Sequence, residues 1–405
     1  MNTPHLAVVL LSPLEGDYSL IFEHKVAGVP IFKRLLLTLQ KAGIKEILVL
    51  SHQLDEKSIT AHQQSIEKDS RFKTPMHWHD HTCFFEKSDS DQVNALTQSQ
   101  PFLAVNGNLV THQKVIQRFI ELTNCKSSDK VLRLESKLDS PGVIRRLPSS
   151  QFFALSHSNE LEIDEELVAL SSGTNFGIEV QNNTSALVAE GHLLKSVGLN
   201  NDSFMDRVVT RFISRQLTRL FLKTPLTPNQ ITFLSLMIGL GSAFFFYQGT
   251  FFSGITGALL LLVSAWVDCT DGEIARLKFM ETPWGARFDI LCDNIVHCIV
   301  FFTIGMGLFF STGDAWYKLY GGLAVFGSLV SFLLLSGIIV RKKQEASQGN
   351  TTETTLADQI ANRDFTYFLF VMACIGRLDI FILLTAIGSN IFALYLIIKH
   401  ATSKQ

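Results

Sequence analysis

Cysteine is scarce in this sequence, and it never occurs as a Cys-x-x-Cys pair. The 405 residues include six cysteines. Cys83 and Cys125 lie far apart in the N-terminal half, whereas the others lie in or beside apolar segments of the C-terminal half. This spacing argues against a disulfide framework, so we expect reduced thiols that pack as small hydrophobic side chains.

The opening residues also lack the features of a cleavable signal peptide. The segment MNTPHLAVVLLSPLEG has no basic start, and Pro13 and Glu15 interrupt its apolar run. We therefore expect the N-terminal half to stay in the cytoplasm.

Charged residues are few after about residue 230, although they make up 18% of the whole sequence. Phe, Leu, Ile and Gly dominate this half, and several apolar segments approach the ~20 residues needed to cross a membrane. We expect an all-α membrane domain over 224–400 with six transmembrane helices, at 231–248, 252–270, 287–311, 317–340, 364–377 and 379–398.

Basic residues near the ends of these segments predict the orientation. Lys318 and Arg377 apart, they fall on one side of a six-helix domain, which the positive-inside rule makes cytoplasmic: Lys223, Arg276, Lys278, Arg341, Lys342, Lys343 and Lys399. We expect a multi-pass integral membrane protein, in the inner (cytoplasmic) membrane if the source is bacterial, with its N-terminal domain facing the cytoplasm.

Residues 1–204 alternate between strand and helix patterns. Buried strands are predicted at LAVVLLS (6–12), KEILVLS (45–51) and PFLAVNGNLV (101–110), and a further helix at 111–123. Pro30 and Gly43 mark the start and end of the helix between the first two strands. This alternation predicts an α/β domain with a largely parallel sheet.

The stretch VAGVPIFKRLLLTLQKAGIKEILVL (26–50) is similar to the helix and second strand of nucleotidyltransferases that make activated sugars or alcohols. Two departures stand out. Those enzymes cradle a triphosphate with a glycine-rich loop, but SPLEGDYS (12–19) has one glycine and two acids. Asn108 replaces their metal-binding aspartate with a poorer Mg²⁺ ligand. We expect a nucleotidyltransferase-like domain that keeps the fold without the chemistry.

The segment HWHDHTC places His77, His79, His81 and Cys83 at alternate positions, so a strand would project them from one face. Zinc accepts these ligand types. Neighbours on one strand face lie ~7 Å apart, however, which is too far for several to share one ion without a turn. A solvated strand face is the simpler interpretation.

A basic amphipathic helix is predicted at 205–223, between the two halves. Arginines recur there every four residues, from Arg207 to Arg219, among apolar residues such as Phe212 and Leu220. Such a helix beside the first membrane span should lie along the membrane surface, although a plain linker helix would show the same pattern.

Carboxylates cluster in VDCTDGEIARLKFMETPWGARFDILCDNIV (267–296). Asp268 and Asp271 share one helix face, and Asp289 and Asp293 share a face of the next helix. Four carboxylates brought together would repel one another unless cations bridged them. Oxygen ligands of this kind select Mg²⁺ or Mn²⁺, with two ions expected. Small residues nearby leave a cleft, and Arg276 beside it suits a phosphate-bearing substrate.

These residues match the signature of the CDP-alcohol phosphotransferases, which are also called CDP-alcohol phosphatidyltransferases. The matching positions are Asp268, Asp271, Gly272, Ala275, Arg276, Gly285, Asp289 and Asp293. The strong resemblance covers about 225–398. The layout of the whole chain resembles architectures of the di-myo-inositol-phosphate-phosphate synthase type, in which a cytidylyltransferase domain precedes the membrane domain.

The resemblance implies a role for each position. Asp268, Asp271 and Asp289 would hold two metal ions, with Asp293 completing the site. Cytidine and its diphosphate would be held by Gly272, Ala275, Arg276 and Gly285, with Asn229 nearby. Asp293 would also take the proton from the acceptor hydroxyl, whose oxygen attacks the phosphorus distal to cytidine so that CMP leaves.

The resemblance implies a CDP-alcohol donor, an alcohol acceptor, a lipid bilayer and a homodimer as partners, and no nucleic acid. Arg341, Lys342 and Lys343 with Arg363 could bind a phosphorylated acceptor, such as an inositol phosphate or glycerol phosphate. Positive-inside anchoring explains the same residues equally well. Two other functions stay open: a bifunctional enzyme whose N-terminal domain still makes the CDP-alcohol from CTP, and a non-catalytic membrane scaffold.

Overall fold

The computed structural model describes residues 5–11, 18–51, 56–80, 101–124, 131–135, 144–147, 165–169, 176–197, 205–346 and 364–402. The chain divides into two compact units. The N-terminal unit comprises Met1–Val197 together with Leu277–Phe279, and the C-terminal unit comprises Gly198–Arg276 and Met280–Gln405.

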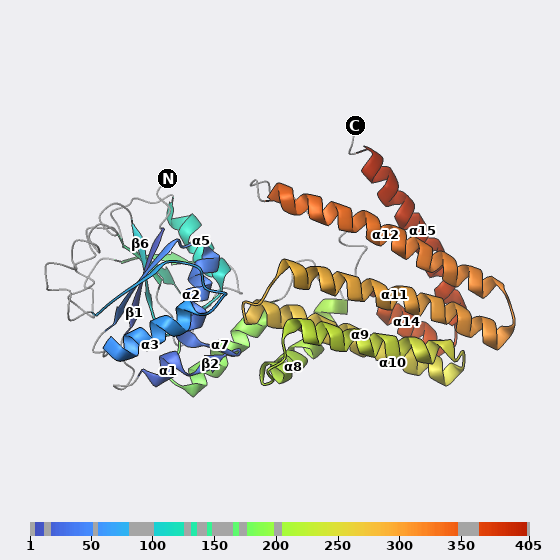
Figure 1. Ribbon diagram of the computed structural model, residues 1–405, viewed down its shortest axis with the longest axis horizontal. Coiled ribbons are helices and arrows are strands. Elements are labelled where there is room, and N and C mark those ends of the chain that lie inside the picture. The colour runs from blue at the N-terminus through green and yellow to red at the C-terminus, as the bar shows by residue number, and fades with distance from the viewer. Residues whose placement is uncertain are drawn as a thin grey trace. The chain divides into compact units, whose positions relative to one another are not determined.

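The N-terminal unit is built on a sheet of seven strands in the order β10-β8-β9-β6-β1-β4-β5 (Figure 1). The strands are β1 (Leu6–Leu11), β4 (Glu46–Ser51), β5 (Met76–Asp80), β6 (Phe102–Asn106), β8 (Val131–Glu135), β9 (Ile144–Leu147) and β10 (Glu165–Ala169). Only β9 runs antiparallel to its neighbours in this sheet. The predicted α/β domain with a largely parallel sheet is therefore confirmed.

The core lies on both faces of this sheet, because alternate residues of a strand point to opposite faces. In β1, Ala7 and Val9 pack in one hydrophobic cluster, and Leu6 and Val8 pack in another. The first cluster also holds buried side chains of α2 (Ile31–Ala42) and α5 (Gln113–Asn124). Strands that are apolar on both faces are typical of parallel sheets with helical cover.

Helix α2 ends where its sequence predicts. Pro30 precedes its first residue, and Gly43 follows the last with φ 99°. This left-handed backbone conformation favours glycine, because a Cβ atom would crowd the carbonyl. The remaining elements of the unit are α1 (Ser19–Phe22), β2 (Lys25–Val26), β3 (Val29–Pro30), α3 (Glu56–Glu67), β7 (Leu109–Thr111), β11 (Gly177–Glu179) and α7 (Asn183–Ser196).

The stretch 101–110 is two strands rather than the single one predicted. β6 ends at Asn106, and β7 begins at Leu109 and pairs with β11 in a separate ladder. Gly107 donates its backbone N–H to the carbonyl of Leu10 at 2.7 Å, which ends the run of β6 beside β1. The apolar pattern alone could not show this turn.

The C-terminal unit is helical. Its helices are a π-helical turn (Asp206–Thr210), α8 (Arg211–Leu222), α9 (Pro228–Tyr247), α10 (Phe251–Leu277), α11 (Pro283–Thr312), α12 (Trp316–Ala346), α14 (Asp364–Ile375) and α15 (Leu378–Thr402). Figure 1 shows α9, α11 and α12 as long rods that run beside one another.

Within the described residues, five helices are long and apolar enough to cross a membrane, not six. Helix α14, predicted as the fifth span, has 12 residues. At 1.5 Å per residue the described part of this helix is about 18 Å long, whereas the hydrocarbon layer is about 30 Å thick. The sixth span therefore stays a prediction. The predicted boundary at Gly376 is observed, because α14 ends at Ile375 and α15 begins at Leu378.

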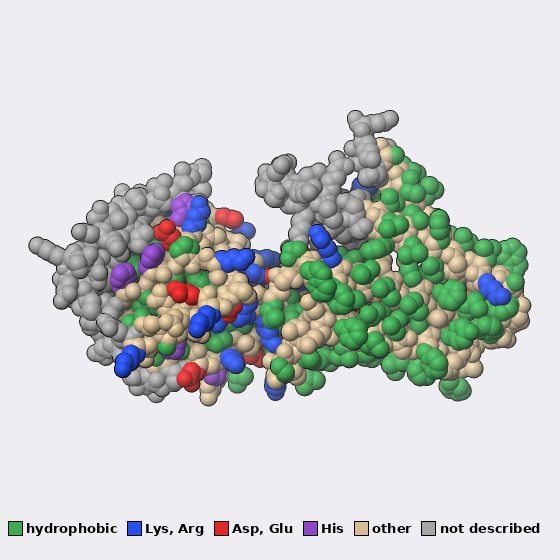
Figure 2. Space-filling model, in the orientation of Figure 1, with side chains coloured by type: hydrophobic (Ala, Val, Ile, Leu, Met, Phe, Trp, Pro, Cys, Tyr) green, Lys and Arg blue, Asp and Glu red, His purple; other side chains and the backbone are tan. Residues whose placement is uncertain are grey.

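The outer surface of this unit is apolar. Green side chains are spread over the face of this unit seen in Figure 2, and large ones such as Phe233, Phe252 and Ile391 are exposed. Inside, small residues allow close approach of helices: a Cβ atom on Gly305 of α11 would lie 2.9 Å from the Cα atom of Gly321 in α12. Such an exterior and such contacts are typical of helices packed in a bilayer.

Candidate active site

Three aspartates from two helices converge in the C-terminal unit. Asp268 and Asp271 come from α10, and Asp289 comes from α11. Each can offer an oxygen, and these oxygens all lie within 4.8 Å of one another. Asp268 and Asp271 are buried, and Asp289 is half-buried. The geometry suits a divalent cation, because hard oxygen ligands bind Mg²⁺ and Mn²⁺, and buried carboxylates require such a partner.

Helix α9 contributes two hydroxyl groups that the sequence did not single out. Thr232 bonds through Oγ1 to Oδ2 of Asp271, and Ser235 donates from Oγ to Oδ1 of Asp268 at 3.2 Å. These bonds fix the orientation of both carboxylates, as second-layer groups do around metal ligands. A signal was present in the sequence, because Asn229, Thr232 and Ser235 recur every three residues and so share one helix face.

Arg276 lies over Gly272 on α10. A Cβ atom added to Gly272 would lie 3.2 Å from Nη1 of Arg276, so any larger residue would displace the guanidinium. The Nε atom of Arg276 is buried and has no hydrogen-bond partner among the described residues. A buried donor of this kind favours an anionic ligand that can accept its hydrogen bond.

Gly285 and Asn229 also lie close together. A Cβ atom on Gly285 would lie 3.0 Å from Oδ1 of Asn229 and 3.0 Å from Oγ1 of Thr282. Thr282 caps α11, since its hydroxyl accepts the backbone N–H of Gly285 at 3.0 Å. Ala275 is half-buried, one turn after Asp271 on α10. Predicted nucleotide contacts therefore come from α9, α10 and the first turn of α11.

Asp293 has a different environment from the other aspartates. It is not a member of the three-aspartate group and lines a small cavity instead. The other lining residues are Ser235, Leu236, Leu261, Ser264, Ala265, Cys292, Val296, His297 and Thr366. His297 packs edge-on against Phe365 at 4.9 Å between ring centroids.

Another carboxylate, that of Glu273, is buried directly after Gly272 in the sequence. Its side chain is buried and accepts hydrogen bonds from three residues of α8: Arg211 at 2.7 Å, Ser214 at 2.8 Å and Thr218 at 2.6 Å. The sequence predicted α8 as a basic helix along the membrane surface. The exposure of Phe212 and Leu220 fits that prediction, but Arg211 is buried against Glu273 instead of facing lipid head groups.

Some predicted features lie outside the described residues: the loop at 12–17, His81, Cys83 and Arg363. Arg341, Lys342 and Lys343 belong to α12, but their side chains are not described. His77 and His79 lie on β5, at the edge of the sheet, and His77 is exposed, as a solvated strand face requires.

Five of the described helices are long and apolar enough to span a membrane, and three aspartates converge on two of these helices, one of which also carries Arg276. This combination is typical of membrane proteins that act on phosphate-bearing substrates. Comparison with known proteins gives the family. Residues 225–394 match the model of the CDP-alcohol phosphatidyltransferase family. This part of the chain is a CDP-alcohol phosphatidyltransferase domain.

Individual relatives match over shorter lengths. A bifunctional IPC transferase and DIPP synthase from Aquifex aeolicus is 35% identical over 103 residues, which are 25% of this chain and 22% of that protein. An archaetidylinositol phosphate synthase from Methanothermobacter thermautotrophicus is 28% identical over 128 residues, which are 31% of this chain and 62% of that protein. The chain therefore spans less than two thirds of the length of either relative.

Among solved structures, 4-diphosphocytidyl-2C-methyl-D-erythritol synthase from Anaerococcus prevotii is similar with 13% identity and a TM-score of 0.33. The alignment covers 47% of this chain and 96% of that one.

Proposed function

We propose that this protein transfers a phosphoalcohol group from a CDP-alcohol to an acceptor alcohol and releases CMP. The observation that carries the proposal is the convergence of Asp268, Asp271 and Asp289. Helix α10, which carries two of them, also carries Arg276, whose buried Nε has no hydrogen-bond partner in the part of the chain that the structure describes. Metal ligands and an anion-binding donor are the two elements that transfer of a diphosphate-activated group requires. The family of residues 225–394 supports the same chemistry.

The donor fits the site through its diphosphate and its cytidine. Asp268, Asp271 and Asp289 would hold two Mg²⁺ or Mn²⁺ ions, which neutralise charge on the phosphate oxygens when bound. Arg276 donates to the diphosphate from Nε. Asn229, Gly272, Ala275 and Gly285 are the residues proposed to contact the nucleotide. The two glycines leave room for the side chains beside them, Arg276 at Gly272 and Asn229 at Gly285.

Asp293 is assigned to the acceptor. Its position on the cavity, apart from the three-aspartate group, suits a base that takes the proton of the acceptor hydroxyl. The hydroxyl oxygen forms a bond to the phosphorus distal to cytidine, the bond from that phosphorus to the oxygen of CMP breaks, and the proton passes to Asp293. CMP leaves with the bridging oxygen.

The acceptor is proposed to be a polar alcohol that carries a phosphate. The name of the Methanothermobacter relative includes inositol phosphate, which agrees with this chemistry. The active site and the N-terminal domain are proposed to face the cytoplasm, where CDP-alcohols and phosphorylated polyols would reach them. A homodimer is the expected assembly.

Product analysis tests the proposal. Purified protein is incubated with Mg²⁺, CDP-diacylglycerol and, in separate reactions, inositol phosphate, glycerol phosphate or free inositol, and products are identified by mass spectrometry. Release of CMP together with a new phosphodiester in one of these reactions supports the proposal. CMP release without any acceptor product would show hydrolysis instead of transfer.

A further inference from the structure

The short segment Leu277–Phe279 connects the two halves of the aspartate motif, yet it belongs to the N-terminal unit. Its neighbours along the chain on both sides belong to the C-terminal unit. Arg276 of the motif immediately precedes the segment, and Gly285 follows it within six residues. The contacts of Leu277, Lys278 and Phe279 therefore affect the end of α10 and the start of α11.

Arg34 of α2 binds the first residue of the segment. Its side chain is buried with 2% exposure, and its Nη2 atom donates to the carbonyl of Leu277 at 2.8 Å. Its other bonds go to the carbonyls of Val26 and Ala27. Burial lowers the pKa of Arg34 to about 9. A buried guanidinium that donates to three main-chain oxygens is costly, which indicates that it is kept to hold those backbones in place.

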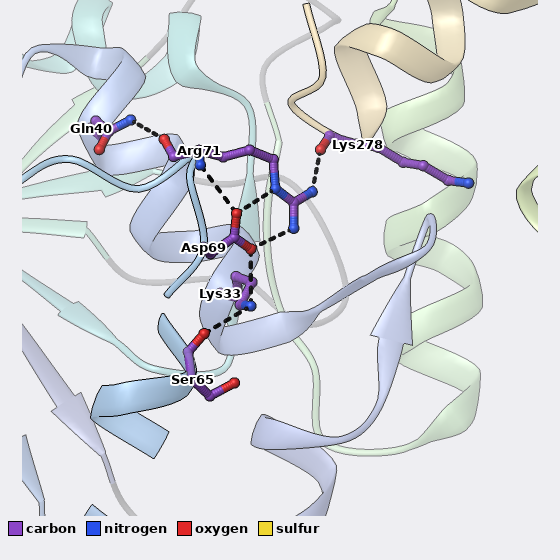
Figure 3. A network of polar contacts seen from close by, with 6 residues as sticks. All are labelled: Lys33, Gln40, Ser65, Asp69, Arg71 and Lys278. Carbon is purple, nitrogen blue, oxygen red and sulfur yellow. Dashed lines mark hydrogen bonds and ion pairs between the residues drawn. The ribbon is translucent and has the colours of Figure 1, made fainter. Parts of the chain in front are cut away.

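Arg71 binds the second residue, as Figure 3 shows. Nη1 of Arg71 donates to the carbonyl of Lys278 at 2.6 Å. Its remaining nitrogens form a two-point contact with Asp69, at 2.8 Å from Nε and 2.7 Å from Nη2. Lys33 binds the same carboxylate at 3.0 Å, and its other hydrogen bond goes to the carbonyl of Ser65, away from the segment. The two-point contact fixes the plane of the guanidinium and so directs Nη1 at Lys278.

Phe279 is held in a third way. Its ring packs against the hydrophobic core of the N-terminal unit, and the cationic groups of Arg34 and Lys41 lie 5.4 Å and 5.3 Å from its centroid. Its backbone has φ 56°, in the left-handed region that favours glycine. Met280 donates its N–H to the carbonyl of Ala275 at 2.8 Å, so Phe279 occupies the position where helix ends usually carry glycine. A strained aromatic residue there points to a function of its ring.

We propose that Arg34, Arg71 and Phe279, named here the carbonyl clamp, are positioning residues for the aspartate site. The clamp fixes the last carbonyls of α10, whose final two turns carry Asp271, Gly272 and Arg276. It also fixes the start of the connection to Gly285. The proposal rests on the proposed function of that site. It gives the N-terminal domain a task that requires no nucleotide chemistry of its own.

The test uses the full-length protein and its variants. The variants distinguish a positioning role of the clamp from the role of an ordinary helix C-cap. Phe279→Gly removes the ring but supplies the residue that a helix end prefers, so a purely structural cap would be unchanged or more stable. Arg71→Ala removes the bond to Lys278, and Arg71→Lys keeps one donor. Lys33→Ala is the matched control, because it loses a contact to Asp69 in the same network without touching the segment.

Three measurements are made on each protein: hydrogen exchange of the amides at 275–285, Mn²⁺ affinity from the spectroscopic signal of free Mn²⁺, and kcat and KM for a CDP-alcohol. For Phe279→Gly and Arg71→Ala we expect faster exchange, Mn²⁺ binding weakened several-fold and kcat lower by about tenfold, the scale on which displaced groups act. Arg71→Lys should recover part of each change, and Lys33→Ala should match the parent protein.

Unchanged exchange and unchanged Mn²⁺ affinity in both Phe279→Gly and Arg71→Ala would overturn the clamp. If Arg71→Ala fails to fold, hydrogen exchange and Mn²⁺ affinity of Phe279→Gly alone decide whether the clamp positions the site. If the parent protein transfers nothing, the proposed function is wrong, whereas exchange and Mn²⁺ affinity still decide whether the segment is held as proposed.

Discussion

At the scale of single residues, the aspartates divide into two kinds. Asp268, Asp271 and Asp289 bring their oxygens within 4.8 Å of one another, and Asp293 lines a small cavity together with Ser235. The spacing in the sequence predicted a shared face for each pair, because helical periodicity is regular. It could not predict the division, which depends on how α9 and α11 pack around the site.

Removal of one metal-binding charge should stop the reaction. Asp268→Asn and Asp289→Asn each replace a charged ligand with a neutral one, so turnover should fall below about a tenth of the parent value even with Mg²⁺ in excess. Turnover is measured as CMP release. Activity above that level in either variant would contradict the assignment of that aspartate as a ligand, and a chelator provides the control.

Asp293 should differ from Asp271 in the step that it affects. A base is needed only when the acceptor is attacked, so Asp293→Asn should still bind a CDP-alcohol with Mg²⁺ while turnover falls by ~10²–10⁴. Asp271→Asn should weaken donor binding and turnover together. Titration with a CDP-alcohol distinguishes the two, and equal loss of binding would identify Asp293 as chiefly a metal ligand.

At the scale of elements, one buried carboxylate, Glu273, makes the polar contact between α10 and α8. Glu273→Gln keeps the shape of the side chain but leaves the buried Arg211 without its countercharge, which should destabilise the protein by about 3 kcal/mol. Thermal unfolding in detergent measures the effect. Arg219→Gln on the exposed face of α8 is the control, and an equal shift in both variants would contradict a special role for Glu273.

Helix α3 carries a group whose protonation should weaken the N-terminal unit. His62 stacks on Phe22 at 3.8 Å, and burial lowers its pKa below 6.5. The unfolded chain therefore binds a proton at a higher pH than the folded one, so this contribution to stability is complete above pH 6.5 and decreases as pH falls below it. Unfolding followed between pH 7.5 and 5 should show the decrease, and His62→Phe should reduce it.

Prediction from sequence succeeded for elements where one local rule is decisive, and it missed features that depend on packing. Helix α2 ends at Gly43 because a left-handed residue is needed there. Helix α14 is apolar, but its described part has 12 residues, so the sixth membrane span stays a prediction. Phe279 follows the end of α10 where glycine is usual, so the sequence does not mark this helix C-cap. Nothing in the sequence around Arg34 predicts that its side chain is buried.

At the scale of the whole molecule, the N-terminal unit should not make a CDP-alcohol. Asn108, at the position of the expected metal ligand, is buried and donates from Nδ2 to the carbonyl of Val180 at 3.2 Å. Its side chain is thus engaged in the fold. Full-length protein supplied with CTP and a phosphorylated alcohol should release no pyrophosphate in a coupled assay. Steady release would establish the bifunctional alternative.

The carbonyl clamp also has a consequence for the evolutionary record of this protein. Arg34 and Arg71 bind main-chain oxygens of Leu277 and Lys278, and every amino acid supplies that oxygen. A substitution at 277 or 278 therefore requires no matching substitution at 34 or 71. Methods that find contacts from paired changes in related sequences would be blind to this link. In related sequences this link would appear as arginines retained at positions 34 and 71, while the side chains at positions 277 and 278 vary.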